Sequence, residues 1–84
     1  MNELKKPKPK KNLKTLKGRL RYLREKSGYS LQDVALKMGK SASYRNLIFK
    51  WEQEGEYDPS IKSIKALAEV YGVSIDWIIS GESK

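Results

Sequence analysis

From Leu16 onward, hydrophobic residues recur every three to four positions, which is the period of an α-helix with one buried face. In the first such stretch Leu16, Leu20 and Leu23 share the apolar face. Thr15 is expected to cap the N-terminus of this helix, and Gly28 to end it in the left-handed conformation. The positions around these leucines are basic, namely Lys17, Arg19, Arg21, Arg24 and Lys26.

Four further amphipathic stretches follow, and most of them open at a serine and end at a glycine. They are Ser30–Gly39, about Tyr44–Gln53, Ser60–Gly72 and Ser74–Gly81. Their predicted apolar positions are Leu31, Val34, Ala35, Met38, Leu47, Ile48, Trp51, Ile61, Ile64, Leu67, Ala68, Tyr71, Ile75, Trp77, Ile78 and Ile79. Five short helices with brief connections predict an all-α, compact five-helix domain over residues 15–81, followed by a short tail at 82–84.

Residues 1–14 have a different composition. They carry six lysines against one acid, with two prolines among the lysines and little apolar surface to pack, which predicts a flexible basic arm. The arm lysines that we single out are Lys5, Lys6, Lys8, Lys10 and Lys11. Either the arm is a solvated tail that aids solubility, or it is a polycation that orders on nucleic acid.

Charge divides the 84-residue chain, whose formal net charge is +8. Residues 1–14 contribute +5, residues 15–50 contribute +7 and residues 51–84 contribute −4. A basic portion followed by an acidic one indicates that one surface meets a polyanion while another does not. Nucleic acid fits this pattern, whereas an anionic membrane fits less well because the arm lacks an amphipathic apolar face.

The composition also argues against several classes of protein. The chain has no cysteine and no histidine, so we expect no disulfide, no metal site and no cofactor, and an enzyme is a poor interpretation. It has no apolar run of the ~20 residues that span a bilayer and no signal-peptide pattern, from which we expect a cytoplasmic protein.

The second and third predicted helices are joined by a short polar linker that begins at Gly39. This is the sequence form of a helix-turn-helix, and the small side chain of Ala35 would let the third helix cross the second closely. Many small helical bundles contain such turns, so the spacing alone leaves open whether the pair binds DNA.

Taken together, the motifs of residues 15–81 resemble the phage repressor/Cro-type (Xre-type) helix-turn-helix family. The resemblance is carried by Leu16-x3-Leu20-Arg21-x-Leu23-Arg24, Ser30-x3-Val34-Ala35-x2-Met38-Gly39, Ile48-x2-Trp51-Glu52, Pro59-Ser60-x3-Ile64-x2-Leu67-Ala68 and the continuous segment Tyr71–Gly81. It implies a double-stranded-DNA-binding transcriptional regulator of phage or mobile-element kind, with a recognition helix at about 44–53 in the major groove.

The resemblance also assigns roles to residues. Base reading falls to Arg45, Asn46, Phe49 and Lys50. Contacts to the DNA backbone fall to Ser30, Gln32, Lys40, Ser41, Ser43 and Tyr44. The chemistry of the first set agrees, because arginine can fork onto guanine and asparagine onto adenine. A structural ion pair is expected between Arg24 and Glu52.

Three features depart from the family pattern. The linker after Gly39 is about three residues longer than usual, which leaves the cap of the recognition helix open between Ser41, Ser43 and Tyr44. Leu31 stands where the family often has a phosphate-holding glutamine, with Gln32 one residue later. The turn after the recognition helix is acidic rather than basic, with carboxylates at Glu54, Glu56 and Asp58.

We expect a repressor that binds a palindromic operator as a homodimer, because one short helix makes few base contacts. The apolar residues Trp77, Ile78 and Ile79 are the candidate dimer interface, and the alternative is that they close the core of the monomer. A different function remains open: a helix-turn-helix module that acts on a protein partner, as an antitoxin, antirepressor or coactivator bridge.

Overall fold

The computed structural model describes residues 12–53, 55 and 57–82, and within them the chain is entirely helical. The α-helices are α1 (Leu16–Ser27), α2 (Leu31–Lys37), α3 (Arg45–Glu52), α4 (Ile61–Tyr71) and α5 (Ile75–Ser80), with a short 3-10 helix, η2 (Ala42–Tyr44), before α3. The five predicted α-helices and the all-α fold class are confirmed. The lysines assigned to the arm lie outside the described residues, as do Glu54 and Glu56.

The helix ends follow from local hydrogen bonding. Thr15 Oγ1 accepts a hydrogen bond from the backbone N–H of Gly18, and Ser60 and Ser74 cap α4 and α5 in the same way. Gly28 ends α1 with φ of 75°, a left-handed conformation that suits a residue without a Cβ. The predicted caps of these helices are therefore confirmed.

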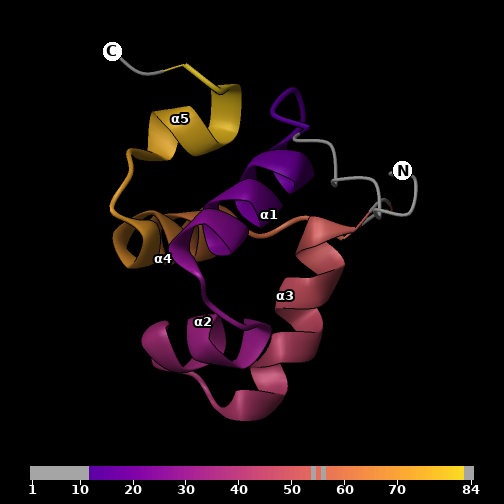
Figure 1. The fold of residues 1–84 in the computed structure, drawn as a ribbon, viewed down its shortest axis with the longest axis vertical. Coiled ribbons are helices and arrows are strands. Elements are labelled where there is room, and N and C mark those ends of the chain that lie inside the picture. Colours follow the sequence, from indigo (N-terminus) through magenta and orange to yellow (C-terminus); the bar gives the residue numbers. More distant parts are fainter. Residues whose placement is uncertain (1–11, 54, 56, 83–84) are drawn as a thin grey trace, which may run out of the picture.

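The helices are arranged around α1 (Figure 1). One end of the molecule is formed by α2, η2 and α3, which pack on one another, and the opposite end is formed by α5, which contacts α1 and α4. Because α1 also contacts α3, it connects the helix-turn-helix pair to the rest of the domain.

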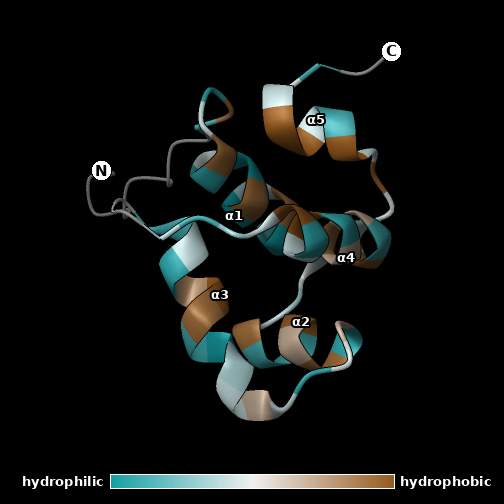
Figure 2. Ribbon diagram, turned by 180° about the vertical axis from the view of Figure 1, so that it is seen from behind, coloured by the Kyte–Doolittle hydropathy of each residue, from teal (hydrophilic) through white to brown (hydrophobic). Residues whose placement is uncertain are grey.

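A single core lies between the helices. Its fully enclosed members come from every α-helix and are Leu20, Leu23, Val34, Ala35, Ile48, Trp51, Ile64, Leu67, Ala68 and Ile78. Figure 2 shows brown, apolar segments alternating with teal, polar ones around the helices, as the sequence period requires. Burial of these side chains is the main force that fixes α3 against α1 and α2.

Two positions differ from the predicted pattern. Ile61 is 61% exposed, because it is the first residue of α4 and lies before the helix reaches the core. Arg19 was placed among the polar positions of the first helix but is 4% exposed. Its position between Leu16 and Leu23, one residue before Leu20, puts it on the buried side of α1.

Candidate nucleic-acid interface

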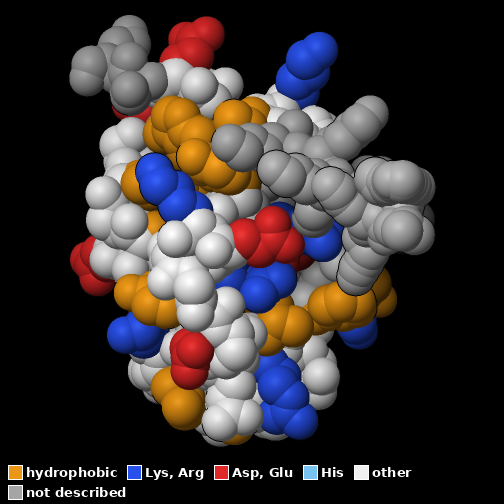
Figure 3. All heavy atoms as spheres, viewed as in Figure 1, with side chains coloured by type: hydrophobic (Ala, Val, Ile, Leu, Met, Phe, Trp, Pro, Cys, Tyr) orange, Lys and Arg blue, Asp and Glu red, His pale blue; other side chains and the backbone are white. Residues whose placement is uncertain are grey.

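The exposed side of α3 carries the residues expected to read bases. Arg45, Asn46, Phe49 and Lys50 are all exposed, while Ile48 and Trp51 on the other side are in the core. Phe49 is 49% exposed, so about half of its surface is accessible on this side of the helix. Figure 3 shows basic side chains near the start of α3. The helix thus presents two hydrogen-bonding side chains in its first turn, and an aromatic ring and an ammonium one turn later.

The longer linker is accommodated by η2, which leads directly into α3. Ser41 stands at the N-cap of η2, and Tyr44 stands at the N-cap position of α3 without making a side-chain capping bond. The Tyr44 ring instead meets Trp51 edge-on, with the ring centroids 6.0 Å apart. Arg45 Nη1 donates to the carbonyl oxygen of Ala42 at 3.0 Å, so this guanidinium is held at the junction of η2 and α3.

The linker also carries three of the side chains expected near phosphates. The hydroxyls of Ser41 and Ser43 hydrogen-bond each other at 2.9 Å and are exposed. The Lys40 ammonium lies 5.4 Å from the centroid of the Tyr44 ring. These side chains come just before α3 in the chain, next to Arg45 at its first position.

The N-terminus of α2 is closed by a reciprocal capping box. The Asp33 N–H donates to Ser30 Oγ at 3.0 Å, and the Ser30 N–H donates to Asp33 Oδ2 at 2.8 Å. These hydrogen bonds hold the pKa of Asp33 below its ordinary value. Leu31 packs against the core, whereas Gln32 is exposed.

Arg24 and Glu52 form an ion pair between α1 and the last residue of α3. Arg24 Nε lies 2.9 Å from Glu52 Oε2, and Arg24 Nη2 lies 2.9 Å from Glu52 Oε1. The Glu52 side chain is 2% exposed, and this hydrogen bonding raises the pKa of Arg24 despite its partial burial. The pair fixes the end of the candidate recognition helix to the scaffold.

Close to this pair, Tyr71 Oη is buried without a hydrogen-bond partner, the one such side-chain atom within the described part of the chain. Burial raises the pKa of Tyr71 above its ordinary range, and the nearby Glu52 charge acts in the same direction. The ring itself stacks on Tyr29 at 6.3 Å between centroids. Tyr71 therefore contributes packing rather than hydrogen bonding.

The turn after α3 is held to α1 by Lys17, a contact that the sequence analysis missed. The Lys17 ammonium lies 3.2 Å from Asp58 Oδ1 and also donates to the carbonyl oxygen of Tyr57. In addition, the Lys50 ammonium lies 4.8 Å from the centroid of the Tyr57 ring. One of the three carboxylates of the acidic turn, that of Asp58, is thus paired within the protein.

Arg19 is a second residue whose role was missed. Its guanidinium donates to the carbonyl oxygens of Ile78, Ile79 and Leu13 at 2.7, 2.7 and 2.8 Å. Burial lowers the pKa of Arg19 from its ordinary value, but arginine stays charged in proteins. The guanidinium therefore connects α1 to the C-terminal end of α5, where the helix dipole favours a cation.

The three candidate dimer residues of α5 have different surroundings. Ile78 is fully buried, and Trp77 packs against the core with part of its surface exposed. These two residues therefore help to close the core of the monomer, which was the alternative to a dimer interface. Ile79 is 47% exposed. Figure 3 shows apolar side chains gathered on the surface over α5 and the neighbouring end of α1.

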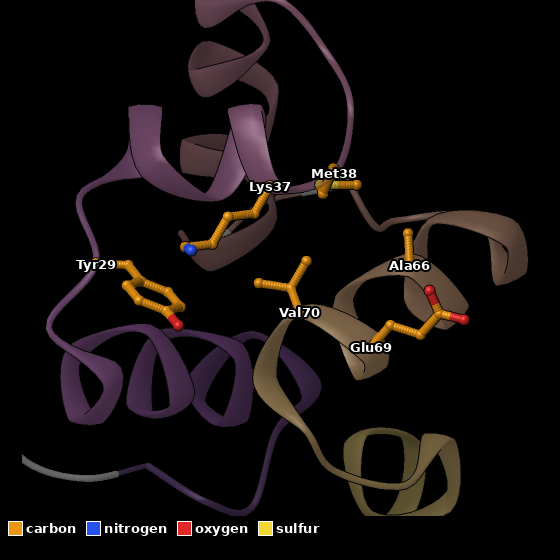
Figure 4. Close-up of a pocket in the computed structure, with 6 residues that line it drawn as sticks. All are labelled: Tyr29, Lys37, Met38, Ala66, Glu69 and Val70. Carbon is orange, nitrogen blue, oxygen red and sulfur yellow. The ribbon is translucent and has the colours of Figure 1, made fainter.

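A hollow of about 370 Å³ opens between α2 and α4 (Figure 4). Its lining consists of Tyr29, Lys37, Met38, Ala66, Glu69 and Val70. The Lys37 side chain extends toward Tyr29, and its ammonium lies 4.8 Å from the centroid of that ring. None of the residues expected to contact DNA lines this hollow.

Two kinds of feature are absent from the described residues. No group of three or more acidic, cysteine or histidine side chains is placed to hold a metal ion there. No helix of that part of the chain is long and apolar enough to cross a bilayer.

Comparison with known proteins places this arrangement in a class. A helix-turn-helix family model matches residues 20–78. Among solved structures, the chain is similar to SinR, described as the master regulator for biofilm formation, in a crystal structure with DNA. The match has 30% sequence identity and a TM-score of 0.61, and covers 76% of this chain and 97% of the SinR chain. The search of curated proteins found no match.

The chain belongs to the helix-turn-helix family of the phage repressor/Cro (Xre) type. The class that the fold defines is that of DNA-binding transcription regulators, with α2 and α3 as the helix-turn-helix pair.

Proposed function

We propose that the protein is a sequence-specific transcriptional repressor that binds a palindromic operator as a homodimer, with α3 in the major groove. The observation that carries the proposal is the exposed side of α3, where Arg45, Asn46, Phe49 and Lys50 stand over a buried side formed by Ile48 and Trp51. A side chain reads a base edge best when its helix is rigid, and this helix is fixed by the core and by the Arg24–Glu52 pair.

The side chains of α3 match the groups on base edges. Arg45 can donate two hydrogen bonds to guanine O6 and N7, and Asn46 can pair with adenine N6 and N7. Lys50 offers a cation to guanine or to a phosphate, and the exposed ring of Phe49 suits contact with a thymine methyl. The resemblance to SinR, whose structure contains DNA, supports placing α3 in the groove.

The length of α3 supports a dimer. Its eight residues span about 12 Å, which brings few base pairs within reach of one monomer. Two copies related by a two-fold axis would read two half-sites about 34–36 Å apart, or a multiple of that distance. Within α5, Ile79 and the exposed part of Trp77 are the available contacts, since Ile78 is enclosed in the core.

Electrostatic attraction adds to this sequence reading. Residues 1–50 carry most of the positive charge, and the lysines of residues 1–14 would attract any duplex whatever its sequence. Replacing Lys5, Lys6, Lys8, Lys10 and Lys11 with glutamine should weaken binding to all duplexes alike. The slope of log affinity against log salt concentration should also become less steep, by ~0.9 for each phosphate contact that is lost. An unchanged slope would show that these lysines do not contact DNA.

Selection of bound duplexes from a random pool tests the proposal. The expected result is a consensus made of two inverted half-sites. Analytical ultracentrifugation of the complex should show two protein chains bound to each duplex. Enrichment of a single half-site would contradict the dimer, and no enrichment at all would contradict sequence-specific binding. Reporter expression from a promoter that contains the selected site should fall when the protein is present, whereas a rise would contradict repression.

A further inference from the structure

Tyr57 lies outside the helix-turn-helix pair, in the turn between α3 and α4, and no sequence motif gives it a role. The Lys50 ammonium lies 4.8 Å from the centroid of the Tyr57 ring, within the ~6 Å over which a ring attracts a cation. Both side chains are exposed, Tyr57 by 57%. The contact therefore stands on the surface, next to the exposed side of α3.

The backbone at Tyr57 is held to α1. Lys17 of α1 donates to the Tyr57 carbonyl oxygen and pairs with Asp58 at 3.2 Å. The Lys17 side chain is 16% exposed, and Pro59 beyond the pair is buried. The backbone on both sides of Asp58 is thus held to the domain, and the ring lies beside Lys50 of α3.

Lys50 has a long side chain that gains from being held in place before DNA binds. It lies one helical turn beyond Asn46, and its flexible stem would lose rotamer freedom on binding a base or phosphate. A ring that already restricts the stem in the free protein reduces this loss. The ammonium has three N–H donors, so contact with the ring on one side leaves donors for a DNA acceptor.

We propose that Tyr57 is a positioning residue, whose ring holds the Lys50 ammonium at the DNA-facing side of α3. This inference rests on the proposed function, because it assigns Lys50 to DNA. Tyr57 then contributes to sequence preference at the base pair that Lys50 contacts, without reading a base itself. The acidic turn after α3 accordingly supports DNA recognition through Tyr57, which is its one aromatic residue.

A double-mutant cycle tests the inference on the full chain. Dissociation constants for the duplex selected from the random pool are measured for the parent, Lys50→Gln, Tyr57→Leu and the double variant. Tyr57→Leu should weaken binding by up to about 5-fold, because the pre-ordering of Lys50 is worth no more than the one exposed cation–ring contact that provides it. In the Lys50→Gln background, Tyr57→Leu should have no further effect, because the cation that it positions is absent.

Two matched variants separate positioning from other effects. Tyr57→Phe keeps the ring and should retain the affinity that Tyr57→Leu loses. Lys37→Gln removes a lysine at the same 4.8 Å from a tyrosine ring, beside the hollow between α2 and α4, and should not change sequence preference. Tyr57→Leu and Lys50→Gln should relax preference at the same base pair, which a purely structural role for Tyr57 would not produce.

The outcomes distinguish this inference from the function on which it rests. If the parent enriches no sequence, both are overturned. If the parent binds its consensus but Tyr57→Leu binds equally well, or if the losses of the two single variants add fully in the double variant, only the positioning role is overturned. A loss in Tyr57→Phe as large as that in Tyr57→Leu would also overturn it, since the hydroxyl and not the ring would then be responsible.

Discussion

Arg24 on α1 and Glu52 at the end of α3 are joined by paired hydrogen bonds, with Arg24 Nε 2.9 Å from an oxygen of a carboxylate that is 2% exposed. The pair connects the scaffold helix to the helix that carries the candidate base-reading residues. The pair therefore holds the C-terminal end of α3 against α1.

Removing Arg24 should therefore destabilise the domain. Arg24→Ala leaves the Glu52 carboxylate buried without its cation, and we expect a loss of ~2–4 kcal/mol in the free energy of unfolding. This loss lies toward the lower end of the range for buried pairs, because the Arg24 side chain is 18% exposed. Urea denaturation measures the loss. Arg21→Ala breaks the exposed Arg21–Glu25 pair on the same helix and should cost at most ~0.5 kcal/mol. Equal losses would contradict the structural role of the Arg24–Glu52 pair.

Arg19 should be as important as Arg24 although it has no acidic partner among its hydrogen bonds. Arg19→Met keeps an apolar stem but leaves three carbonyl oxygens without their donor, and we expect a loss of ~2–4 kcal/mol. Hydrogen exchange should also become faster in α5, whose last turn Arg19 holds. Arg21→Met is the control on the exposed side of α1, and a loss no larger than the control's would contradict the contact.

Asp33 should give the domain part of its acid sensitivity. Its pKa is lowered in the folded state by hydrogen bonds from Ser30, so the stabilisation is present above its ordinary pKa of 3.8 and is lost as the pH falls through the folded value. Asp33→Asn should therefore flatten the decline in stability below about pH 4. Asp76→Asn changes a first-turn acid of α5 that is one position too early for a capping box, and serves as the control. Identical acid profiles for Asp33→Asn and the parent would contradict this account.

Tyr71→Phe should leave the domain equally stable or stabilise it by up to ~1 kcal/mol, because the variant removes a buried hydroxyl that has no hydrogen-bond partner. The ring that stacks on Tyr29 is kept. Thermal unfolding followed by circular dichroism measures the difference, and Tyr57→Phe removes an exposed hydroxyl for comparison. A loss above 1 kcal/mol in Tyr71→Phe would show that the hydroxyl does make a stabilising bond.

Local signals explain most of what could be predicted from the sequence. Caps such as Thr15, Ser30 and Gly28 act within a few residues of the helix ends, and the leucine period of α1 reports directly on its buried side. For the same reason, four exposed residues of α3 could be placed relative to Ile48 and Trp51 by helical period alone.

Contacts between distant segments could not be predicted in this way. Arg19 is charged and is therefore expected at the surface, although it lies on the face of Leu16 and Leu23. Two of its three carbonyl partners are 59 and 60 residues away in α5. The pairing of Lys17 with Asp58 and the contact of Lys50 with Tyr57 depend on how the turn folds back over α1. The helical position of Arg19 was the one available signal.

Base reading by the first turn of α3 is the central claim, and the ratio of affinities for selected and random duplexes tests it most directly. Asn46→Ala and Arg45→Ala should each weaken binding to the selected duplex about 5- to 150-fold, equivalent to ~1–3 kcal/mol, because each removes a paired contact to a base edge. Binding to a random duplex should change far less, and Lys37→Gln should leave the ratio unchanged. A ratio that stays constant, with both duplexes weakened equally, would contradict the claim that α3 reads sequence.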